Sequence, residues 1–442
     1  MPVERETHMA HPSDQKAEDW NGTRVLGVTL SALAIIFDGF DNQALGLAVA
    51  GIAREWHMAA SALAPASFMS LAGMTVGTAI AGVLGDRLGR RKMMIASVAL
   101  FGLFTLATAL ATNIESLTLI RFLTGLGLGG AMPNATALAA EFSPVRARPF
   151  AVTATIVCVP LGGVLGGMVA ADILPTHGWR AMFLVAGSIP CLLALALALW
   201  LPESPSFLAI RAAKQMHGAA IAPRKRASIG QLFAPAFLRD TVGLWAAFFL
   251  CLIAVYTTFS WLPATLASAG FDQKTASLGL ASFNFGGVAG ALLAALVIGR
   301  LGSRVTMTGL AAIGAAIATL ALLAGTGGLS RTGLLMVLTA LGFTVNGVQT
   351  TMFALASHVY PSAMRATGVG AALGFGRVGA MASSLAGFYL LSSGSTVGFF
   401  TLLALAMAGS AVALAIIAQH IPSARAANRS ARHAEAMASP RP

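Results

Sequence analysis

Ionisable side chains within long apolar runs are the first candidates for chemistry in this sequence. Asp38 and Asp41 lie in the run 25–47, and Arg377 lies in the run 367–391. A spacing of three residues puts both carboxylates on one side of a helix. Charged groups are costly in hydrocarbon, so this side is expected to face the protein interior. Neighbouring carboxylates held away from water take up protons readily, and we therefore predict proton coupling through Asp38, Asp41 or both.

Arg377 is predicted to lie near the middle of the bilayer. A guanidinium group binds a carboxylate through two parallel hydrogen bonds, so we expect Arg377 to bind a substrate carboxylate. The alternative is an ion pair with Asp38 or Asp41, and the two arrangements could exchange. Arg121 lies near the outer end of the run 118–141. It is expected to help move protons, to pair with Asp41, or to extend to the surface with its stem among apolar contacts.

Uncharged polar and aromatic side chains in the runs are candidates for a cavity wall. Apolar walls with a few placed polar groups suit an acid that carries a ring. Substrate contacts are predicted from Phe40, Gln43, Tyr256, Asn284 and Asn346. Aromatic residues in such runs also pack against lipid or protein, so the structural alternative stays open for each of them.

The composition requires a bilayer around most of the chain. Of the 442 residues, 57% are hydrophobic and only 10% are charged, whereas soluble domains carry roughly 25% charged residues. This excludes an ordinary water-soluble protein and a disordered one. A helix needs about 20 apolar residues to cross the hydrocarbon layer. Twelve runs reach that length: 25–47, 63–84, 93–112, 118–141, 149–172, 180–201, 240–263, 277–299, 305–324, 332–357, 367–391 and 396–419.

The distribution of positive charge predicts both termini in the cytoplasm. Most of the 28 Lys and Arg residues fall in the tails and loops on that side. The opposite loops hold Arg54, Arg180, Lys274 and Arg331. This asymmetry accounts for the net charge of +12 without a nucleic-acid partner.

The longest polar break divides the twelve runs into two sets of six. The predicted organisation is a cytoplasmic N-tail 1–24, a bundle 25–201, a cytoplasmic linker 202–239, a second bundle 240–419 and a cytoplasmic C-tail 420–442. The two sets also share local sequence, because Leu-Gly follows the second run at position 88 and the eighth run at position 301. Secondary transporters are built from such repeats, with the substrate site between them near the midplane.

Two motifs in the first half resemble a known superfamily. The loop Gly82-x-x-Gly85-Asp86-Arg87-x-Gly89-Arg90-Arg91 resembles the signature loop of the major facilitator superfamily. The residues that follow Arg121 resemble its second motif, with glycine at positions 125, 127, 129 and 130. Asp38-Gly39-Phe40-Asp41 resembles the first-span motif of the aromatic acid:proton symporter family, and the segment around Cys158 and Pro160 resembles its hydroxyphenylpropionate transporters.

The resemblance implies an all-α membrane protein with twelve transmembrane helices in two pseudo-symmetric six-helix bundles. It implies proton-coupled import of an aromatic carboxylate, of the hydroxyphenylpropionate or hydroxybenzoate type, by alternating access across the bacterial inner membrane. Asp38, Asp41 and Arg121 are then the proton-coupling residues. Asp86, Arg87 and Arg90 are expected to gate the inner side. The second half has Gly299 at the position equivalent to Asp86, so the acidic residue of such a gate is present in the first half only.

Other function classes remain as alternatives. A proton-antiport exporter of drugs or aromatic acids would use the same residues, and a receptor for aromatic acids would need no net flux. We expect no enzyme activity, cofactor or metal, because the sequence has no nucleophile–base set, metal-ligand cluster or nucleotide loop. The predicted partners are a small aromatic carboxylate, protons and the lipid bilayer, without nucleic acid or an obligate protein partner.

Overall fold

The regular structure of the chain is helical throughout its described residues. The computed structural model describes residues 20–217, 228–325, 330–361, 364–392 and 396–424. Its long helices are α2 (Gly22–Glu55), α3 (Ala64–Leu88), α4 (Arg90–Thr108), α5 (Ile114–Phe142), α6 (Arg148–Trp200), α8 (Leu238–Ser268), α9 (Gln273–Leu301), α10 (Ser303–Ala324), α11 (Arg331–Val359), α12 (Arg365–Ser392) and α13 (Thr396–Ile416). Shorter helices are η1 (Ala60–Leu63), η2 (Val145–Ala147), α7 (Pro205–His217) and η3 (Ile229–Phe233).

The described helices supply the twelve predicted membrane segments. Ten of the described helices are long and apolar enough to cross a membrane. One of the ten is α6, whose 53 residues would span about 80 Å, far more than one bilayer of about 30 Å. Gly178 divides α6 into two arms, because its φ of 74° lies in the left-handed region that glycine adopts without strain. The two arms and α5, whose Arg121 and glycines lower its hydropathy, complete the twelve and confirm the predicted fold class.

Several helices extend beyond the predicted runs. Helix α2 continues to Glu55, eight residues past the end of the run 25–47, so Arg54 lies in its last turn rather than in a loop. The predicted linker 202–239 contains the exposed helix α7 and the short helix η3. The predicted tails 1–24 and 420–442 lie mostly outside the described residues.

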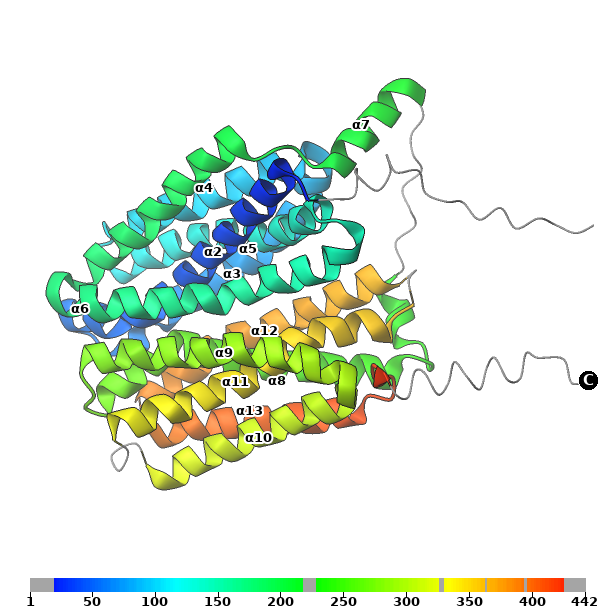
Figure 1. The fold of residues 1–442 in the computed structure, drawn as a ribbon. Helices are drawn as coiled ribbons and strands as arrows, with labels where there is room; N and C mark the ends of the chain where they lie inside the picture. Colours follow the sequence, from blue (N-terminus) through cyan, green and yellow to red (C-terminus); the bar gives the residue numbers. More distant parts are fainter. Residues whose placement is uncertain (1–19, 218–227, 326–329, 362–363, 393–395, 425–442) are drawn as a thin grey trace, which may run out of the picture.

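The helices form two bundles side by side (Figure 1). Helices α2 to α6 make one bundle, in blue to green, and α8 to α13 make the other, in green to red. Within each bundle the tightest packing repeats, since α3 lies against α5 in the first and α9 against α11 in the second. The matching pairs are what a duplicated six-helix unit predicts.

Glycines let α2 and α6 approach each other closely. A Cβ atom on Gly39 would overlap the carbonyl oxygen of Val159, and one on Gly162 would overlap the carbonyl oxygen of Ile36. Small residues permit this backbone contact between membrane helices. The contact fixes the rotation of α2 within the first bundle, and so decides where Asp38 and Asp41 point.

The two bundles meet through α6 with α9, α2 with α8, and α12 with α3 and η1. Several contacts between the bundles lie toward the C-terminal end of α2. Gln273 donates a hydrogen bond to the carbonyl oxygen of Leu47 at 3.3 Å, and Lys274 forms an ion pair with Asp172 at 3.5 Å. A Cβ on Gly46 would overlap the carbonyl oxygen of Phe259. The structure therefore holds the bundles together at this end.

Candidate functional site

Asp41 and Arg121 form a buried ion pair within the first bundle. The guanidinium Nη1 of Arg121 lies 3.4 Å from both carboxylate oxygens of Asp41, and Arg121 is only 1% exposed. Thr105 donates a hydrogen bond of 2.6 Å to the same carboxylate, and Arg121 also donates to Ser70 at 3.3 Å. Of the arrangements expected for Arg121, the structure shows the pair with Asp41 and excludes extension to the surface.

Asp38 has a different environment, although it lies one helical turn from Asp41. It is 3% exposed, and its Oδ1 atom has no hydrogen-bond partner among the described residues. It lines a cavity between the bundles, to which Asn42 on the same helix face also contributes. The expectation of one shared face is therefore only partly met. Asp41 turns into the first bundle, whereas Asp38 faces the cavity.

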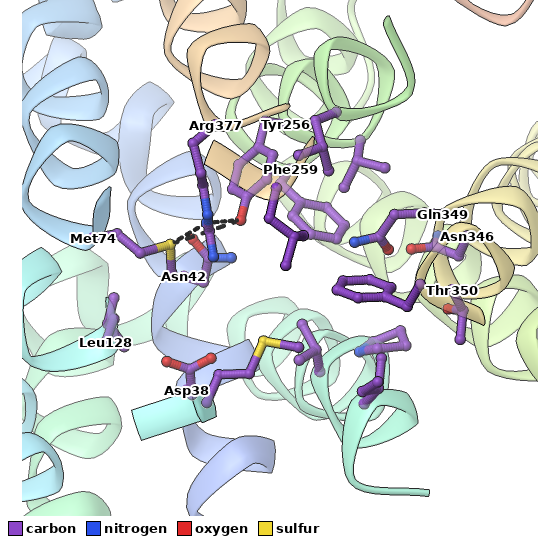
Figure 2. A pocket seen from close by; sticks show the side chains of 18 of the residues that line it. Asp38, Asn42, Met74, Leu128, Tyr256, Phe259, Asn346, Gln349, Thr350 and Arg377 are labelled. Carbon is purple, nitrogen blue, oxygen red and sulfur yellow. Dashed lines mark hydrogen bonds between the residues drawn. The ribbon is translucent and has the colours of Figure 1, made fainter. Parts of the chain in front are cut away.

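Arg377 enters the same cavity from α12. Its Nη1 donates a hydrogen bond to the hydroxyl of Tyr256 at 2.7 Å and lies 2.6 Å from the sulfur of Met74 (Figure 2). Its guanidinium carbon lies 5.9 Å from the centre of the Tyr256 ring. None of the ion pairs formed in the described part of the chain includes Arg377. The alternative of an ion pair with Asp38 or Asp41 is thus not what this conformation contains.

The cavity is small in this conformation. Its volume is about 60 Å³. One water occupies about 30 Å³ of liquid, and an apolar cavity of about 150 Å³ admits benzene, so the space here suits water rather than a ring. An aromatic ligand would need the walls to move apart. The polar and charged side chains of the wall are Asp38, Asn42, Tyr256, Asn346, Gln349, Thr350 and Arg377.

The structure separates the residues predicted for substrate contact into two groups. Arg377, Tyr256 and Asn346 lie in the cavity wall. Phe40, Gln43 and Asn284 do not. Phe40 packs against α6 at Gly166. The contact between α2 and α6 turns Phe40 and Gln43 toward other helices in this conformation, and Asn284 on α9 pairs with Gln43. None of the three lines the cavity here, and their contact with substrate stays a prediction.

Gln43 and Asn284 instead bind each other across the two bundles. Asn284 donates to the side-chain oxygen of Gln43 at 2.6 Å, and Gln43 donates back at 3.2 Å. Both side chains are fully buried. Gly163 on α6 leaves the space that the pair occupies, since a Cβ there would overlap the Gln43 amide. The pair is a specific contact that exists only while the bundles are together at this point.

The wall also contains residues that were not predicted from the sequence, among them Asn42, Thr350 and Met74. Two of these three could have been predicted from their spacing, because Asn42 follows Asp38 by four residues and Thr350 follows Asn346 by four. Residues four apart share a helix face. Met74 could not have been predicted, since a methionine in a membrane helix usually packs against apolar neighbours.

The predicted gate residues lie at the end of the molecule where α3 meets α4. Arg90 forms an ion pair with Glu141, and Glu141 also accepts a hydrogen bond from Ser204 at the start of the linker. Arg90 and Glu141 both belong to the first bundle, so this ion pair does not bridge the bundles. Arg87 is exposed. The side chain of Asp86 lies outside the described part of the structure.

The described residues contain no cluster of three or more His, Cys, Asp or Glu side chains that could hold a metal ion. The cysteines at 158, 191 and 251 are free and partly or fully buried. The chemistry available at the cavity is therefore that of one unpaired carboxylate, one guanidinium group and neutral polar side chains.

Comparisons with known proteins agree with this architecture. Residues 31–384 match the model of the Major Facilitator Superfamily. The chain is 35% identical to the gallate transporter of Pseudomonas putida, covering 92% of this chain and 95% of that protein. It is 36% identical to the 3-(3-hydroxy-phenyl)propionate transporter of Escherichia coli K12, covering 85% and 89%. It is 34% identical to the 4-hydroxybenzoate transporter PcaK of Pseudomonas putida, covering 83% and 86%.

A solved structure supports the fold at lower sequence identity. The D-xylose-proton symporter superposes with a TM-score of 0.70 at 18% identity, covering 91% of this chain and 98% of that one. The family model spans most of the chain, and the match to the gallate transporter covers 92% of it. This chain therefore belongs to the Major Facilitator Superfamily and is a multi-pass membrane transporter rather than an enzyme.

Proposed function

We propose that this transporter imports an aromatic carboxylate of the hydroxyphenylpropionate or hydroxybenzoate type together with protons. The relatives described above are named as transporters of gallate, 4-hydroxybenzoate and 3-(3-hydroxy-phenyl)propionate. The observation that carries the proposal for this chain is Arg377, a cation in the cavity between the bundles with no carboxylate partner among the described residues. Asp38 lines the same cavity but forms no ion pair with Arg377, so the guanidinium group is available to bind a substrate carboxylate.

The substrate carboxylate binds Arg377 and Tyr256 together. The guanidinium group offers two parallel N–H donors, and the Tyr256 hydroxyl, 2.7 Å from Nη1, adds a neutral donor beside them. Met74, which contacts the same nitrogen, is a weak acceptor that a carboxylate displaces easily. The aromatic ring then lies among the apolar side chains of the wall, such as Phe259 and Leu252.

Asp38 carries the proton. It faces the same cavity as Arg377 and has an unpartnered oxygen, so it is free to exchange a proton with water that enters there. Asp41 is held by Arg121 and Thr105, and it supports the rotation of α2 rather than exchanging directly. One proton carried with one monoanion moves no net charge, and each additional proton adds about 2.3 kcal/mol per 100 mV.

The orientation that follows from the positive-inside asymmetry places both termini in the cytoplasm and the contact between Asp172 and Lys274 at the periplasmic end. The protein acts in the bacterial inner membrane as a single chain without an obligate protein partner. In this orientation the contacts between the bundles close the periplasmic side.

The test is uptake of radiolabelled 4-hydroxybenzoate and 3-(3-hydroxyphenyl)propionate into cells that express the chain. We expect accumulation that a protonophore abolishes and that Arg377→Ala removes, with wild-type levels of the variant in the membrane. A matched control is Arg180→Ala, whose side chain pairs with Glu55 away from the cavity and should not affect uptake. Absence of uptake of either acid by correctly inserted wild-type protein would overturn the assignment. Uptake of the acid into everted vesicles when their lumen is made acidic would establish export by proton antiport instead.

A further inference from the structure

Three neutral polar side chains on α11 share one face toward the cavity. Asn346, Gln349 and Thr350 follow the helical spacing of three and four residues, and all three line the cavity. Asn346 donates a long bond of 3.3 Å to the carbonyl of Gly342. No hydrogen bond involves the side chain of Gln349 or Thr350 within the described residues, although both are partly shielded from solvent.

The neighbouring Thr351 shows that polar side chains on α11 do not all lack a hydrogen-bond partner. Its hydroxyl donates to the carbonyl of Gly347 at 2.7 Å, and its side chain is buried away from the cavity. A threonine in a helix normally makes this bond to its own backbone. Thr350 leaves its hydroxyl available instead, on the side that faces the cavity.

The polar face of α11 lies across the cavity from the carboxylate-binding groups. Figure 2 shows Arg377 and Tyr256 on one side and Gln349, Asn346 and Thr350 on the other, with the ring of Phe259 between them. The charged residues among the described wall are Asp38 and Arg377, and neither belongs to the α11 face. This face therefore matches a neutral group that both donates and accepts hydrogen bonds.

We propose that Gln349 and Thr350 bind a hydroxyl substituent on the aromatic ring, at the end away from the carboxylate. The inference rests on the proposed function, because it needs the carboxylate at Arg377. A phenolic hydroxyl donates one hydrogen bond and accepts others, which an amide and a threonine hydroxyl can complete. A second carboxylate would find no cation there, and a bare ring edge would leave the two side chains unpaired.

The substrate class is thus narrower than aromatic acids in general. With the carboxylate at Arg377, a hydroxyl in the meta or para position lies on the far side of the ring, and we expect it to face α11 once the walls have moved apart to admit the ring. An ortho hydroxyl lies beside the carboxylate and cannot reach α11. A site that hydrogen-bonds a ligand hydroxyl discriminates against analogues that lack it, and one or two neutral bonds predict a preference of about 10-fold or more.

The experiment measures inhibition of radiolabelled substrate uptake by matched acids. The pairs are 4-hydroxybenzoate with benzoate and 3-(3-hydroxyphenyl)propionate with 3-phenylpropionate, and 2-hydroxybenzoate serves as the isomer that carries its hydroxyl in the wrong place. For the wild type we expect the hydroxylated member of the transported pair to inhibit about 10-fold more strongly, and 2-hydroxybenzoate to resemble benzoate.

The variants test which side chains cause the preference. Thr350→Val and Gln349→Leu are expected to bring the ratio of inhibition constants within each pair close to one, and Thr350→Ser should restore it. Thr351→Val is the matched control, since its hydroxyl is already bonded to the backbone, and the ratio should stay at the wild-type value. The ratio is internal to each variant, so a lower amount of folded protein does not affect it.

Two results would overturn the inference. One is a wild-type protein that binds the members of each pair equally. The other is a ratio that survives in both Thr350→Val and Gln349→Leu. If the acids are transported and depend on Arg377 while either of these results appears, the hydroxyl site is wrong and the proposed function stands. If no aromatic acid is transported at all, the proposed function itself fails.

Discussion

Replacing Gln43 with leucine should weaken the closure of the bundles at the end where Asp172 meets Lys274. Gln43 and Asn284 exchange two hydrogen bonds, of 2.6 and 3.2 Å, between α2 and α9, and both are fully buried. Alternating access requires such contacts to separate in the opposite state. There both amides can be hydrated, so the substitution costs stability only in the closed state.

The magnitude follows from the groups left unpaired. In Gln43→Leu the Asn284 amide keeps its bond of 2.8 Å to the carbonyl of Leu280 but loses both hydrogen bonds with Gln43. A buried polar group without its partner costs about 1–3 kcal/mol. That cost shifts the equilibrium toward the open state by about 5- to 150-fold. The double variant Gln43→Leu/Asn284→Leu removes both amides and should recover much of the closed population.

The assay uses a pair of engineered cysteines at the closed end. Asp172 and Lys274 form an exposed ion pair of 3.5 Å, one residue from each bundle, and Asp172→Cys with Lys274→Cys reports whether these positions meet. The native cysteines at 158, 191 and 251 are first replaced by alanine. We expect oxidative cross-linking to slow in Gln43→Leu relative to the same protein with Gln43. Equal cross-linking rates in the two proteins would show that the amide pair does not stabilise closure.

Three further predictions concern the charged residues. Asp38→Asn should abolish accumulation driven by a pH gradient but retain exchange of labelled for unlabelled acid in proteoliposomes, and accumulation at wild-type level would contradict proton transfer at Asp38. Arg121→Met leaves Asp41 buried without its cation, which should cost about 3–5 kcal/mol and appear as a lower thermal unfolding temperature in detergent; an unchanged temperature would argue against the pair. Arg377→Lys keeps the charge but loses the paired donors, so the apparent KM for the acid should rise by about 10-fold, and an unaltered KM would exclude two-point binding.

The apolar composition and the spacing of runs predicted the helical membrane fold correctly. Twelve runs of membrane-spanning length are a property of the sequence alone, because no soluble core can bury that much apolar surface. The same physics placed Asp38 and Arg377 in the interior, since neither charge is stable against lipid. Even the division into two sets of six follows from the longest polar break. The break at Gly178 within α6 agrees with the predicted separation of the runs 149–172 and 180–201.

The partner of each interior residue could not be predicted in the same way. Helical periodicity relates positions along one helix, but the rotation of that helix against its neighbours depends on packing. The close contact of α2 with α6 at Gly39 turns Asn42 into the cavity and Gln43 toward the second bundle, although Gln43 and not Asn42 was predicted to line a cavity. For the same reason Asp38 and Asp41, three residues apart, have different environments.

Contacts between residues far apart in the chain were decided by the tertiary structure alone. Gln43 meets Asn284 and Met74 meets Arg377 only because the two bundles lie against each other. Local sequence carries no information on such pairs, since the energy that selects them is shared among many side chains packed at once. The sequence determined which groups must be hidden from lipid, and the packing of the bundles determined which of them face the cavity.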